Sequence, residues 1–511
     1  MNDDYVKFIR YAQWKIESNG KGIIGIISNN SYLSGRIHRT MRKELCKTFD
    51  KIYILNLHGD KNKGEPDDNV FDIKQGVSIA LFIKLKDSLE NKEFYYFSTL
   101  DNTIMDRELK YMFLLSDNHI NGIQWRELNP NSPNYLFIPE DGTYKEEYGE
   151  GISIDQIFSE YESGFQSHRD KVTIHFEIGE LIDILVDLIK LTPEEFITEY
   201  KLPKEGRDWS VAGAKDGIIE NIQNLLGKPI NNIAEITDSD WSKIKQERIV
   251  NIQYRAFDDR WTYYYNKSKS FFAYPRYELM QHLISKGNLG LITVKSTSKD
   301  WKHIFVTEKP SDGHSISDRS YVFPLYIDKK ANFTKEFEKF IVKKYSTLPK
   351  PEEIFGYIYA ILNSSKYPEK YNGFLKRDFP RIKLTNDFKR FKLMSKLGLK
   401  LVDTHLLKKG YENSELAKFP INGTNELSKI KYNKKKELLF INKDQYFENV
   451  PEYLWNYYIG DYKVLYKWLS YRKGRILTFN EINHIQKVLR ALNETISIKD
   501  EIDQVYKKLD F

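Results

Sequence analysis

A stretch of twelve residues, Tyr254–Tyr265, brings arginines, aspartates and aromatic rings together in the sequence Tyr-Arg-Ala-Phe-Asp-Asp-Arg-Trp-Thr-Tyr-Tyr-Tyr. Guanidinium groups pair with phosphates, and both guanidinium groups and rings can stack on bases, so this composition suits nucleic acid. The same residues can instead bury their rings and pair arginine with aspartate as a structural ribbon. Composition alone leaves both interpretations open.

In an extended chain, side chains alternate between two faces. Asp258 and Arg260 would then share one face, and Arg255 and Trp261 the other. The pair Asp258-Asp259 is also a plausible turn, which would break this alternation.

Two further segments interleave basic and aromatic residues. In the first, Arg377-Asp378-Phe379-Pro380-Arg381, the proline disfavours a helical conformation at the residue before it, which predicts a turn or a strand start. Either an Arg–Asp pair pins that turn, or its arginines point at phosphate. The second segment reads Lys467-Trp-Leu-Ser-Tyr-Arg-Lys-Gly-Arg475. This pattern is typical of nucleic-acid surfaces, although a charged run is also an ordinary solvated face.

A polar loop containing Asp67, Asp72 and Lys74 invites a nuclease interpretation, since nucleases hold a metal with carboxylates and place a lysine near water. A solvated loop before the next strand is the simpler account. The sequence has no Walker or Gly-x-Gly-x-x-Gly motif, no metal-binding histidine spacing and no Gly-x-Ser-x-Gly turn. We therefore predict no catalytic residue and no metal site in this chain.

Composition narrows the class of protein. Lys plus Arg number 79 against 72 Asp plus Glu, a net charge of +7, which permits an anionic partner without requiring one. The single cysteine, Cys46, excludes an internal disulfide and a cysteine zinc cage. No apolar run approaches the roughly 20 residues that span a bilayer, and no signal-peptide core follows Met1. The sequence predicts a cytoplasmic protein without a membrane partner.

The elements that must position these residues begin with an α/β pattern. Helices are expected over 3–18 and 36–49, and strands over 22–28, 51–57 and 77–85. The strand over 22–28 is almost continuously apolar, as in a buried parallel strand. Asn29, Asn30 and Ser31 follow its carboxyl end, where open α/β sheets bind ligands.

The rest of the chain predicts a mixture of helices and strands. Helices are expected over 177–190, 212–226, 238–246, 336–344, 351–362 and 479–506, with a further helix start at Thr192-Pro193. Strands are expected over 289–295, 303–306 and 321–327. The length suggests roughly three domains.

Eight segments, taken in order, carry a resemblance to a known family: Tyr5–Gln13, Gly25–Leu33, Leu57–Gly59, Asn69–Gly76, Gly164–Asp170, Tyr254–Trp261, Asp378–Ile382 and Lys467–Gly474. Together they resemble the carboxy-terminal half of type ISP restriction-modification enzymes and related adenine-specific DNA methyltransferases. The resemblance implies a partial Rossmann-like methyltransferase sheet followed by an α+β target-recognition region. Residues 1–115 would end the methyltransferase-like domain, 116–250 would be a linker and helical segment, and 251–384 and 385–511 would form the target-recognition region.

The resemblance implies a role for this chain, but the sequence also departs from the family pattern. The family binds S-adenosylmethionine and grips a flipped adenine with Asn-Pro-Pro-Tyr, but this motif and the glycine-containing cofactor loop are absent from this chain. We therefore expect a DNA-binding, target-recognition part that binds no S-adenosylmethionine and transfers no methyl group by itself. An alternative is an interaction subunit that completes a separately encoded methyltransferase or helicase–nuclease chain.

On this interpretation, double-stranded DNA is the partner. The residues expected to face it are Arg255, Arg260, Trp261, Tyr263, Arg377, Arg381, Trp468, Arg472 and Lys473. Asp258 and Asp378 would orient neighbouring arginines, while Asn29, Asn30 and Ser31 would border the methyl-transfer pocket.

Overall fold

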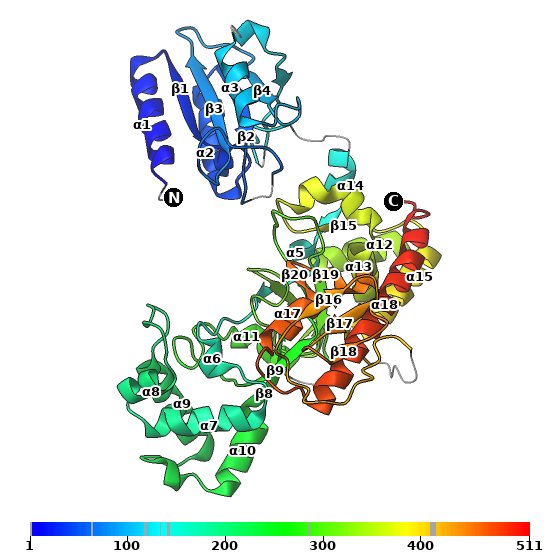
Figure 1. The fold of residues 1–511 in the computed structure, drawn as a ribbon. Helices are drawn as coiled ribbons and strands as arrows, with labels where there is room; N and C mark the ends of the chain where they lie inside the picture. Colours follow the sequence, from blue (N-terminus) through cyan, green and yellow to red (C-terminus); the bar gives the residue numbers. More distant parts are fainter. Residues whose placement is uncertain are drawn as a thin grey trace. The chain divides into compact units, whose positions relative to one another are not determined.

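The computed structural model describes residues 3–62, 65–116, 120–132, 134–139, 144–284, 287–408 and 415–511. The chain forms two compact units, Met1–Lys145 and Glu146–Phe511, called here the N-terminal and C-terminal units (Figure 1). The division into four segments that the sequence predicts remains a prediction. Parts of its linker segment, at 117–119, 133 and 140–143, lie outside the described residues.

The N-terminal unit follows the predicted order of helix, strand, helix, strand, loop and strand. Its main elements are α1 (Asp4–Asn19), β1 (Gly22–Asn29), α2 (Arg39–Thr48), β2 (Lys51–His58), β3 (Val77–Lys84), β4 (Glu93–Ser98), α3 (Arg107–Leu115) and β5 (Arg126–Glu127). The predicted α/β class is confirmed for this unit.

The five strands form one sheet in the order β1-β3-β2-β4-β5. The expectation that β1 is a buried parallel strand is wrong, because β1 pairs antiparallel with β3 along its whole length, from Gly22 opposite Lys84 to Asn29 opposite Val77. Although the run is continuously apolar, Ile24 is buried while Ile23 is 66% exposed. Strand β3 is also antiparallel to β2, and β2 is parallel to β4. Hence β1, β2 and β4 run in the same direction.

Helices cover both faces of this sheet. Ile52 and Ile54 of β2 join a core cluster with Ile9 of α1 and Leu45 of α2. Leu55 and Leu57, on the opposite face of the same strand, join a second cluster that Phe113 of α3 packs against. The alternation of side chains along a strand therefore feeds two apolar layers, as expected for a sheet between helices.

The C-terminal unit mixes helices with small antiparallel sheets. Its helices are α4 (Lys145–Gly149), α5 (Ile154–Ile157), α6 (Asp170–Thr173), α7 (Ile178–Lys190), α8 (Pro193–Glu199), α9 (Val211–Leu226), α10 (Asp238–Arg248), α11 (Tyr277–Met280), α12 (Lys335–Tyr345), α13 (Pro351–Asn363), α14 (Lys366–Leu375), α15 (Phe388–His405), α16 (Glu452–Trp455), α17 (Val464–Tyr471) and α18 (Phe479–Tyr506). All the predicted helices of this region are present.

Its strands are β6 (Ile152–Ser153), β7 (Glu162–Ser163), β8 (Ile249–Arg255), β9 (Asp258–Tyr263), β10 (Gly290–Thr293), β11 (Ile304–Thr307), β12 (Tyr321–Pro324), β13 (Tyr326–Ile327), β14 (Lys330–Ala331), β15 (Arg381–Ile382), β16 (Lys431–Asn433), β17 (Leu438–Phe440), β18 (Tyr446–Phe447), β19 (Tyr458–Ile459) and β20 (Tyr462–Lys463). The four-stranded sheet β11-β10-β12-β7 is the largest sheet among the described residues of this unit, and β8 with β9 forms a separate hairpin.

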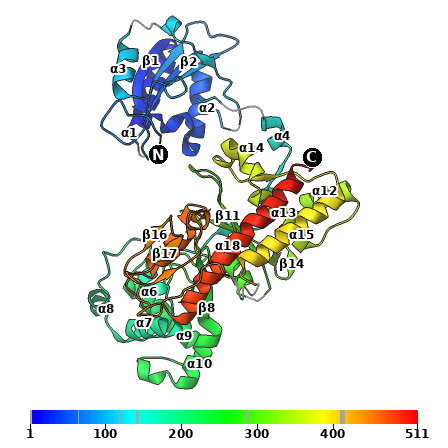
Figure 2. The ribbon, with the colours of Figure 1, turned by 45° about the vertical axis from the view of Figure 1, so that its right-hand side comes forward.

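Helices α13, α15 and α18 pack side by side in the C-terminal unit (Figure 2). The first two approach very closely, because a Cβ atom built on Gly398 would lie 1.8 Å from the Gly356 carbonyl oxygen. The long helix α18 begins with a capping box, in which Thr478 and Glu481 each bond the other residue's backbone.

Candidate functional site

Polar side chains lie where three strands of the N-terminal sheet end. Asn30, just after β1, donates from Nδ2 to Oδ1 of Asn56 at 3.0 Å, and Asn56 donates from Nδ2 to the Tyr96 hydroxyl at 3.0 Å. These three residues come from β1, β2 and β4, whose carboxyl ends share one edge because the strands run in the same direction. In open α/β sheets this is the edge where ligands bind.

The predicted pocket border, Asn29, Asn30 and Ser31, is part of this edge. Oδ1 of Asn29 accepts a hydrogen bond from the Ser31 backbone N–H at 2.7 Å, so it caps the short helix that starts at Asn30. The Asn30 side chain is buried, and its Oδ1 has no hydrogen-bond partner among the described residues. Gly76 is required beside it, because a Cβ there would lie 2.5 Å from Asn30 Nδ2. A role at a methyl-transfer pocket stays a prediction.

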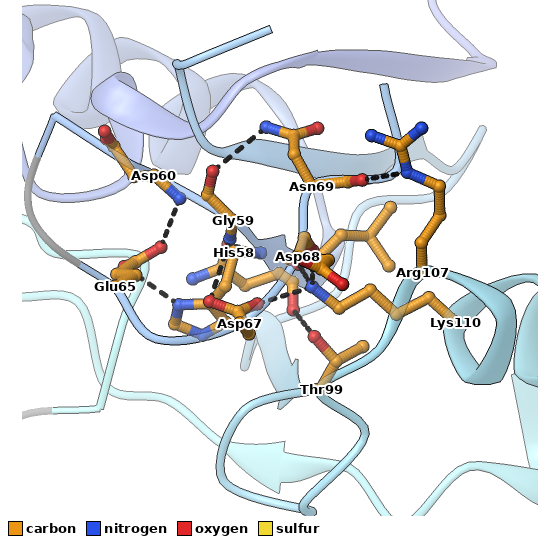
Figure 3. Close-up of polar contacts among 12 residues, drawn as sticks. His58, Gly59, Asp60, Glu65, Asp67, Asp68, Asn69, Thr99, Arg107 and Lys110 are labelled. Atoms are coloured by element: carbon orange, nitrogen blue, oxygen red, sulfur yellow. Dashed lines mark hydrogen bonds and ion pairs between the residues drawn. The ribbon is translucent and has the colours of Figure 1, made fainter. Parts of the chain in front are cut away.

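The loop between β2 and β3 is held to this edge by a buried ion pair (Figure 3). The Lys110 ammonium group from α3 bonds the Asp67 carboxylate, and neither side chain is exposed to solvent. Lys110 also donates to the Leu57 carbonyl oxygen at 2.7 Å and to the carbonyl oxygen of Asp68. Asp67 in turn accepts from the Gly59 backbone N–H at 3.2 Å. The ion pair therefore connects the loop to the end of strand β2.

The two acids of the nuclease hypothesis have separate partners. While Asp67 is enclosed with Lys110, the Asp72 side chain is 91% exposed and pairs with Arg107 at 2.8 Å. Lys74 is exposed, and its backbone carbonyl accepts from Lys61. Over the described ranges, no group of three or more His, Cys, Asp or Glu side chains is placed to hold a metal ion. The simpler account, a solvated loop before the next strand, fits Asp72 and Lys74 but not Asp67, which is buried.

Sequence reasoning assigned no site role to Asn56, His58 or Lys110, although His58 lies in Leu57–Gly59, one of the segments that carry the family resemblance. His58 has a positive φ of 54° and bonds Ser98 Oγ through Nε2 at 2.9 Å and Glu65 through Nδ1 at 3.1 Å. A signal was present for Asn56 and for Lys110. Asn56 interrupts an apolar strand, and Lys110 comes directly before the largely apolar run Tyr111–Leu115 of α3.

In the C-terminal unit, the stretch Tyr254–Tyr265 forms most of the β8–β9 hairpin. Its turn lies at Ala256-Phe257, and not at Asp258-Asp259 as the sequence allowed, because Asp258 already pairs with Arg255 across the ladder. Phe257 has a positive φ of 59°. The turn thus comes two residues earlier, and the alternation that places Asp258 with Arg260 is kept.

Asp258 lies at the centre of a buried set of charges. Its carboxylate accepts from Arg260 Nη2 and from Arg472 Nη2, both at 2.9 Å. Arg472 also donates from Nε to Glu481 at 3.0 Å. Burial raises the pKa of Asp258, but the two guanidinium groups outweigh burial and hold that pKa below its usual value. Asp258 therefore does orient neighbouring arginines, one of them distant in the sequence.

Aromatic rings separate these arginines from one another. The guanidinium carbon of Arg260 lies 4.0 Å from the Phe176 ring centroid and 4.2 Å from that of Tyr254. The guanidinium carbon of Arg255 lies 3.9 Å from the centroid of the same Tyr254 ring, and Arg255 Nη1 pairs with the Asp312 carboxylate at 3.1 Å. Arg472 stacks 3.5 Å from the Trp468 centroid. We call these residues, with Asp258, the arginine–aromatic cluster. Each guanidinium group of the cluster contacts a carboxylate or the face of an aromatic ring. Because these residues come from segments that are distant in the chain, the contacts join those segments.

The nine residues predicted to face DNA divide by exposure. Five are buried: Arg255, Arg260, Tyr263, Trp468 and Arg472. Trp261, Arg377 and Arg381 are partly exposed, and Lys473 is exposed. Arg381 donates from Nη1 to the Gly151 carbonyl oxygen at 2.8 Å. The buried five engage protein groups as a structural ribbon would, and contact with DNA stays a prediction for all nine.

Among the described residues, no helix is long and apolar enough to cross a membrane.

Comparisons with known proteins give the same fold for nearly the whole chain. The nuclease-deletion mutant of the Type ISP restriction-modification enzyme LlaGI, in complex with a DNA substrate mimic, matches with a TM-score of 0.67 at 21% identity over 98% of this chain. The ATP-dependent Type ISP restriction-modification enzyme LlaBIII bound to DNA matches with a TM-score of 0.70 at 20% identity over 98% of this chain. The DrdV–DNA complex matches with a TM-score of 0.67 at 19% identity over 97% of this chain.

These structures are much longer than the present chain, which spans 40% of the LlaGI chain, 34% of the LlaBIII chain and 52% of the DrdV chain. No curated protein matches the sequence. Residues 156–501 match the family model described as the Type ISP C-terminal specificity domain. The resemblance to the carboxy-terminal region of type ISP enzymes is thereby confirmed, and because the match covers more than half of its residues, the chain belongs to the Type ISP C-terminal specificity domain family.

Proposed function

We propose that this chain is the DNA target-recognition part of a site-specific adenine methyltransferase of a type ISP restriction-modification system. The observation that carries the proposal is the family match over residues 156–501, which covers the arginine–aromatic cluster and all nine predicted DNA-facing residues. The LlaGI, LlaBIII and DrdV structures with a similar fold are DNA complexes, which supports duplex DNA as the ligand here as well.

The charges of the C-terminal unit suit this function. Lys473 is exposed, so a DNA phosphate can reach its side chain. Its neighbour Arg472 is buried in the arginine–aromatic cluster, which holds this part of the backbone in place. Trp261 is partly exposed on β9. On this proposal, exposed cations set the register on the DNA backbone, and the buried arginines hold the supporting hairpin in place.

The N-terminal unit supports the other half of the proposal. Strands β1, β2 and β4 end at one edge with Asn30, Asn56 and Tyr96 connected by hydrogen bonds. We infer that this unit is the last part of a Rossmann-like methyltransferase sheet, with Asn29, Asn30 and Ser31 bordering the transfer pocket. Because Asn-Pro-Pro-Tyr and the cofactor loop are absent from this sequence, the chain by itself would bind no S-adenosylmethionine and methylate no adenine.

Two measurements on the purified chain test this function. Its affinity for duplex DNA should fall as salt rises, with a slope of log K against log [salt] of about −0.9 for each phosphate neutralised. An affinity that does not change from low to moderate salt would contradict DNA binding. Incubation with DNA and labelled S-adenosylmethionine should transfer no label, and methylated adenine in the product would contradict the inactivity of the isolated chain.

A second candidate function is an interaction subunit that completes a separately encoded methyltransferase or helicase–nuclease chain. Strand β1 is an edge of the sheet, with Ile23 and Ile27 exposed. Helix α1, which packs beside β1, exposes Phe8, Tyr11 and Trp14 at helical spacing. An unpaired strand edge beside exposed rings is a surface on which another strand can add.

Co-expression separates the two candidates. If a partner chain completes the sheet, the polypeptide encoded next to this one should co-purify with it, and Ile23→Glu should abolish the complex. Stable, monomeric behaviour of this chain in the presence of that polypeptide would leave target recognition as the function.

A further inference from the structure

A cavity of about 270 Å³ lies in the C-terminal unit, between the ends of α13 and α15, the segment 453–459 and helix α18. It is separate from the arginine–aromatic cluster, with which it shares no residue. Two lysines, Lys302 and Lys499, line it together with the aromatic residues Trp301, Tyr453, Tyr457 and Tyr458, and no Asp or Glu does. The size is close to the lower limit of small-ligand sites, which is about 300 Å³.

Two hydrogen-bonding groups in the cavity wall have no protein partner. Neither the Lys499 ammonium group nor the Tyr457 hydroxyl makes a hydrogen bond or an ion pair within the described part of the chain. Both side chains are partly exposed, so a ligand in the cavity can reach them. Desolvation by the surrounding protein lowers the pKa of Lys499, partly offset by Asp503 and Asp500, and raises the pKa of Tyr457. Both groups can therefore donate hydrogen bonds to a ligand in the cavity, and the ammonium group favours an anionic ligand.

The nearby groups that could have bonded Lys499 are engaged elsewhere. The Asp503 carboxylate accepts from the Ser364 hydroxyl at 2.6 Å and from the Ser365 backbone N–H at 2.9 Å. His405 lies between the Tyr359 hydroxyl at 2.5 Å and Thr495 Oγ1 at 3.1 Å. Burial lowers the pKa of His405 to about 3, so its ring is neutral near pH 7. The net charge of the lining is therefore positive, from Lys302 and Lys499.

Aromatic rings stand at the opening of the cavity. Tyr453 is 52% exposed and Tyr458 is 40% exposed, and the Lys302 ammonium group lies 5.3 Å from the centroid of the Tyr458 ring. Exposed rings beside lysines can stack a flat base while the lysines bind the attached phosphate.

We propose that this cavity binds a nucleoside phosphate, with the phosphate held by Lys499 and Tyr457 and the base lying against the exposed tyrosines. The ligand can be a free mononucleotide or a nucleotide within a DNA strand, because the two present the same groups. The inference stands on the cavity itself and does not depend on the proposed function.

Calorimetric titration of the full chain with deoxyadenosine monophosphate, oligodeoxyadenylate, deoxyadenosine and inorganic phosphate tests this. At least one of the two nucleotides should bind, and Lys499→Met and Tyr457→Phe should each weaken that binding by about tenfold or more, as for a lost charge-assisted or buried hydrogen bond. The matched control is Lys487→Met, at an exposed position of the same helix, which should leave binding unchanged.

The outcomes separate the sources of the ligand. Binding of the mononucleotide alone identifies a free nucleotide, and binding of the oligonucleotide alone, weakened by Lys499→Met, identifies a DNA strand. The proposal is overturned if neither nucleotide binds, if Lys499→Met has no effect, or if inorganic phosphate binds as tightly as the nucleotide.

A second readout avoids variants that fold poorly. Because the lowered pKa of Lys499 leaves more of its amine unprotonated at neutral pH, trace acetic anhydride should acetylate it readily in the wild-type chain. The nucleotide that binds should slow this acetylation and leave Lys487 unaffected, and an unchanged rate at Lys499 contradicts the assignment.

Discussion

The carboxylate of Asp258 and the guanidinium group of Arg472 lie 2.9 Å apart, although 214 residues separate them in the chain. Their side chains are 1% and 5% exposed, so the pair is shielded from solvent. It connects the β8–β9 hairpin to the end of α17, and Arg260 binds the other oxygen of the same carboxylate. Two segments that both carry arginines and rings are thereby parts of one rigid cluster.

Arg472→Met should destabilise the chain strongly, because it leaves the buried Asp258 carboxylate with one cation in place of two. Breaking a buried ion pair from one side costs about 3–5 kcal/mol, and urea unfolding measures this loss. The control is Lys473→Met, which changes the exposed neighbour and should lower stability by less than about 0.5 kcal/mol. Equal effects of the two substitutions would mean that the cluster does not stabilise the fold.

Lys473→Gln tests DNA binding at the same place. The substitution removes an exposed cation, so duplex affinity should fall about equally for all sequences, and the salt slope should become smaller by about one phosphate contact. Fluorescence anisotropy at several salt concentrations measures both quantities. An unchanged slope would place the phosphate contacts elsewhere, and Lys487→Gln on α18 provides the matched loss of charge.

His405 should make stability depend on pH in acid. Its folded pKa is about 3 and its unfolded value about 6.5, so the unfolded state binds the proton first as pH falls. The stability that depends on neutral His405 is complete above pH 6.5 and is lost between about pH 6.5 and 3, at about 1.4 kcal/mol for each pH unit. Urea unfolding of wild type and His405→Gln from pH 7 to 4.5 measures the difference. Parallel pH profiles would rule out this contribution.

Lys110→Met should release the loop between β2 and β3. The substitution leaves the Asp67 carboxylate buried without its cation, at a cost of about 3–5 kcal/mol, whereas the double variant Lys110→Met/Asp67→Leu should recover much of that loss. Hydrogen exchange of the backbone over 59–76 reports the release directly. If exchange there stays at the wild-type rate in the single variant, the ion pair does not anchor the loop.

Gly398→Ala should separate α13 from α15. The added methyl group would meet the Gly356 carbonyl oxygen at 1.8 Å, and a backbone atom cannot rotate away, so overpacking should cost about 1–3 kcal/mol or more. Gly373→Ala, in helix α14, has open space at its Cβ and should be stabilising by up to about 1 kcal/mol. Thermal unfolding compares the two alanines, and a neutral Gly398→Ala would show that the helices can shift apart freely.

Local signals in the sequence determined much of the secondary structure. Apolar periodicity predicted α1, α7, α9 and α18, and the Thr192-Pro193 pair marked the start of α8, where a capping box is found. These features depend on neighbours within a few residues, so the sequence contains the information needed to predict them. The order of eight short segments was enough to identify the family.

Tertiary structure alone decided which residues meet. The continuous apolar run of β1 looked like a parallel strand, but β1 pairs antiparallel with β3 and leaves Ile23 exposed. The pairing of a strand depends on the other strands of the sheet and not on its own composition alone. Arginines that look available in the sequence are buried when a distant carboxylate and two rings surround them, as at Arg472. The partners of Lys110 and the position of Lys499 in the cavity wall likewise depend on contacts across tens to hundreds of positions, and spacing along the chain carries no record of them.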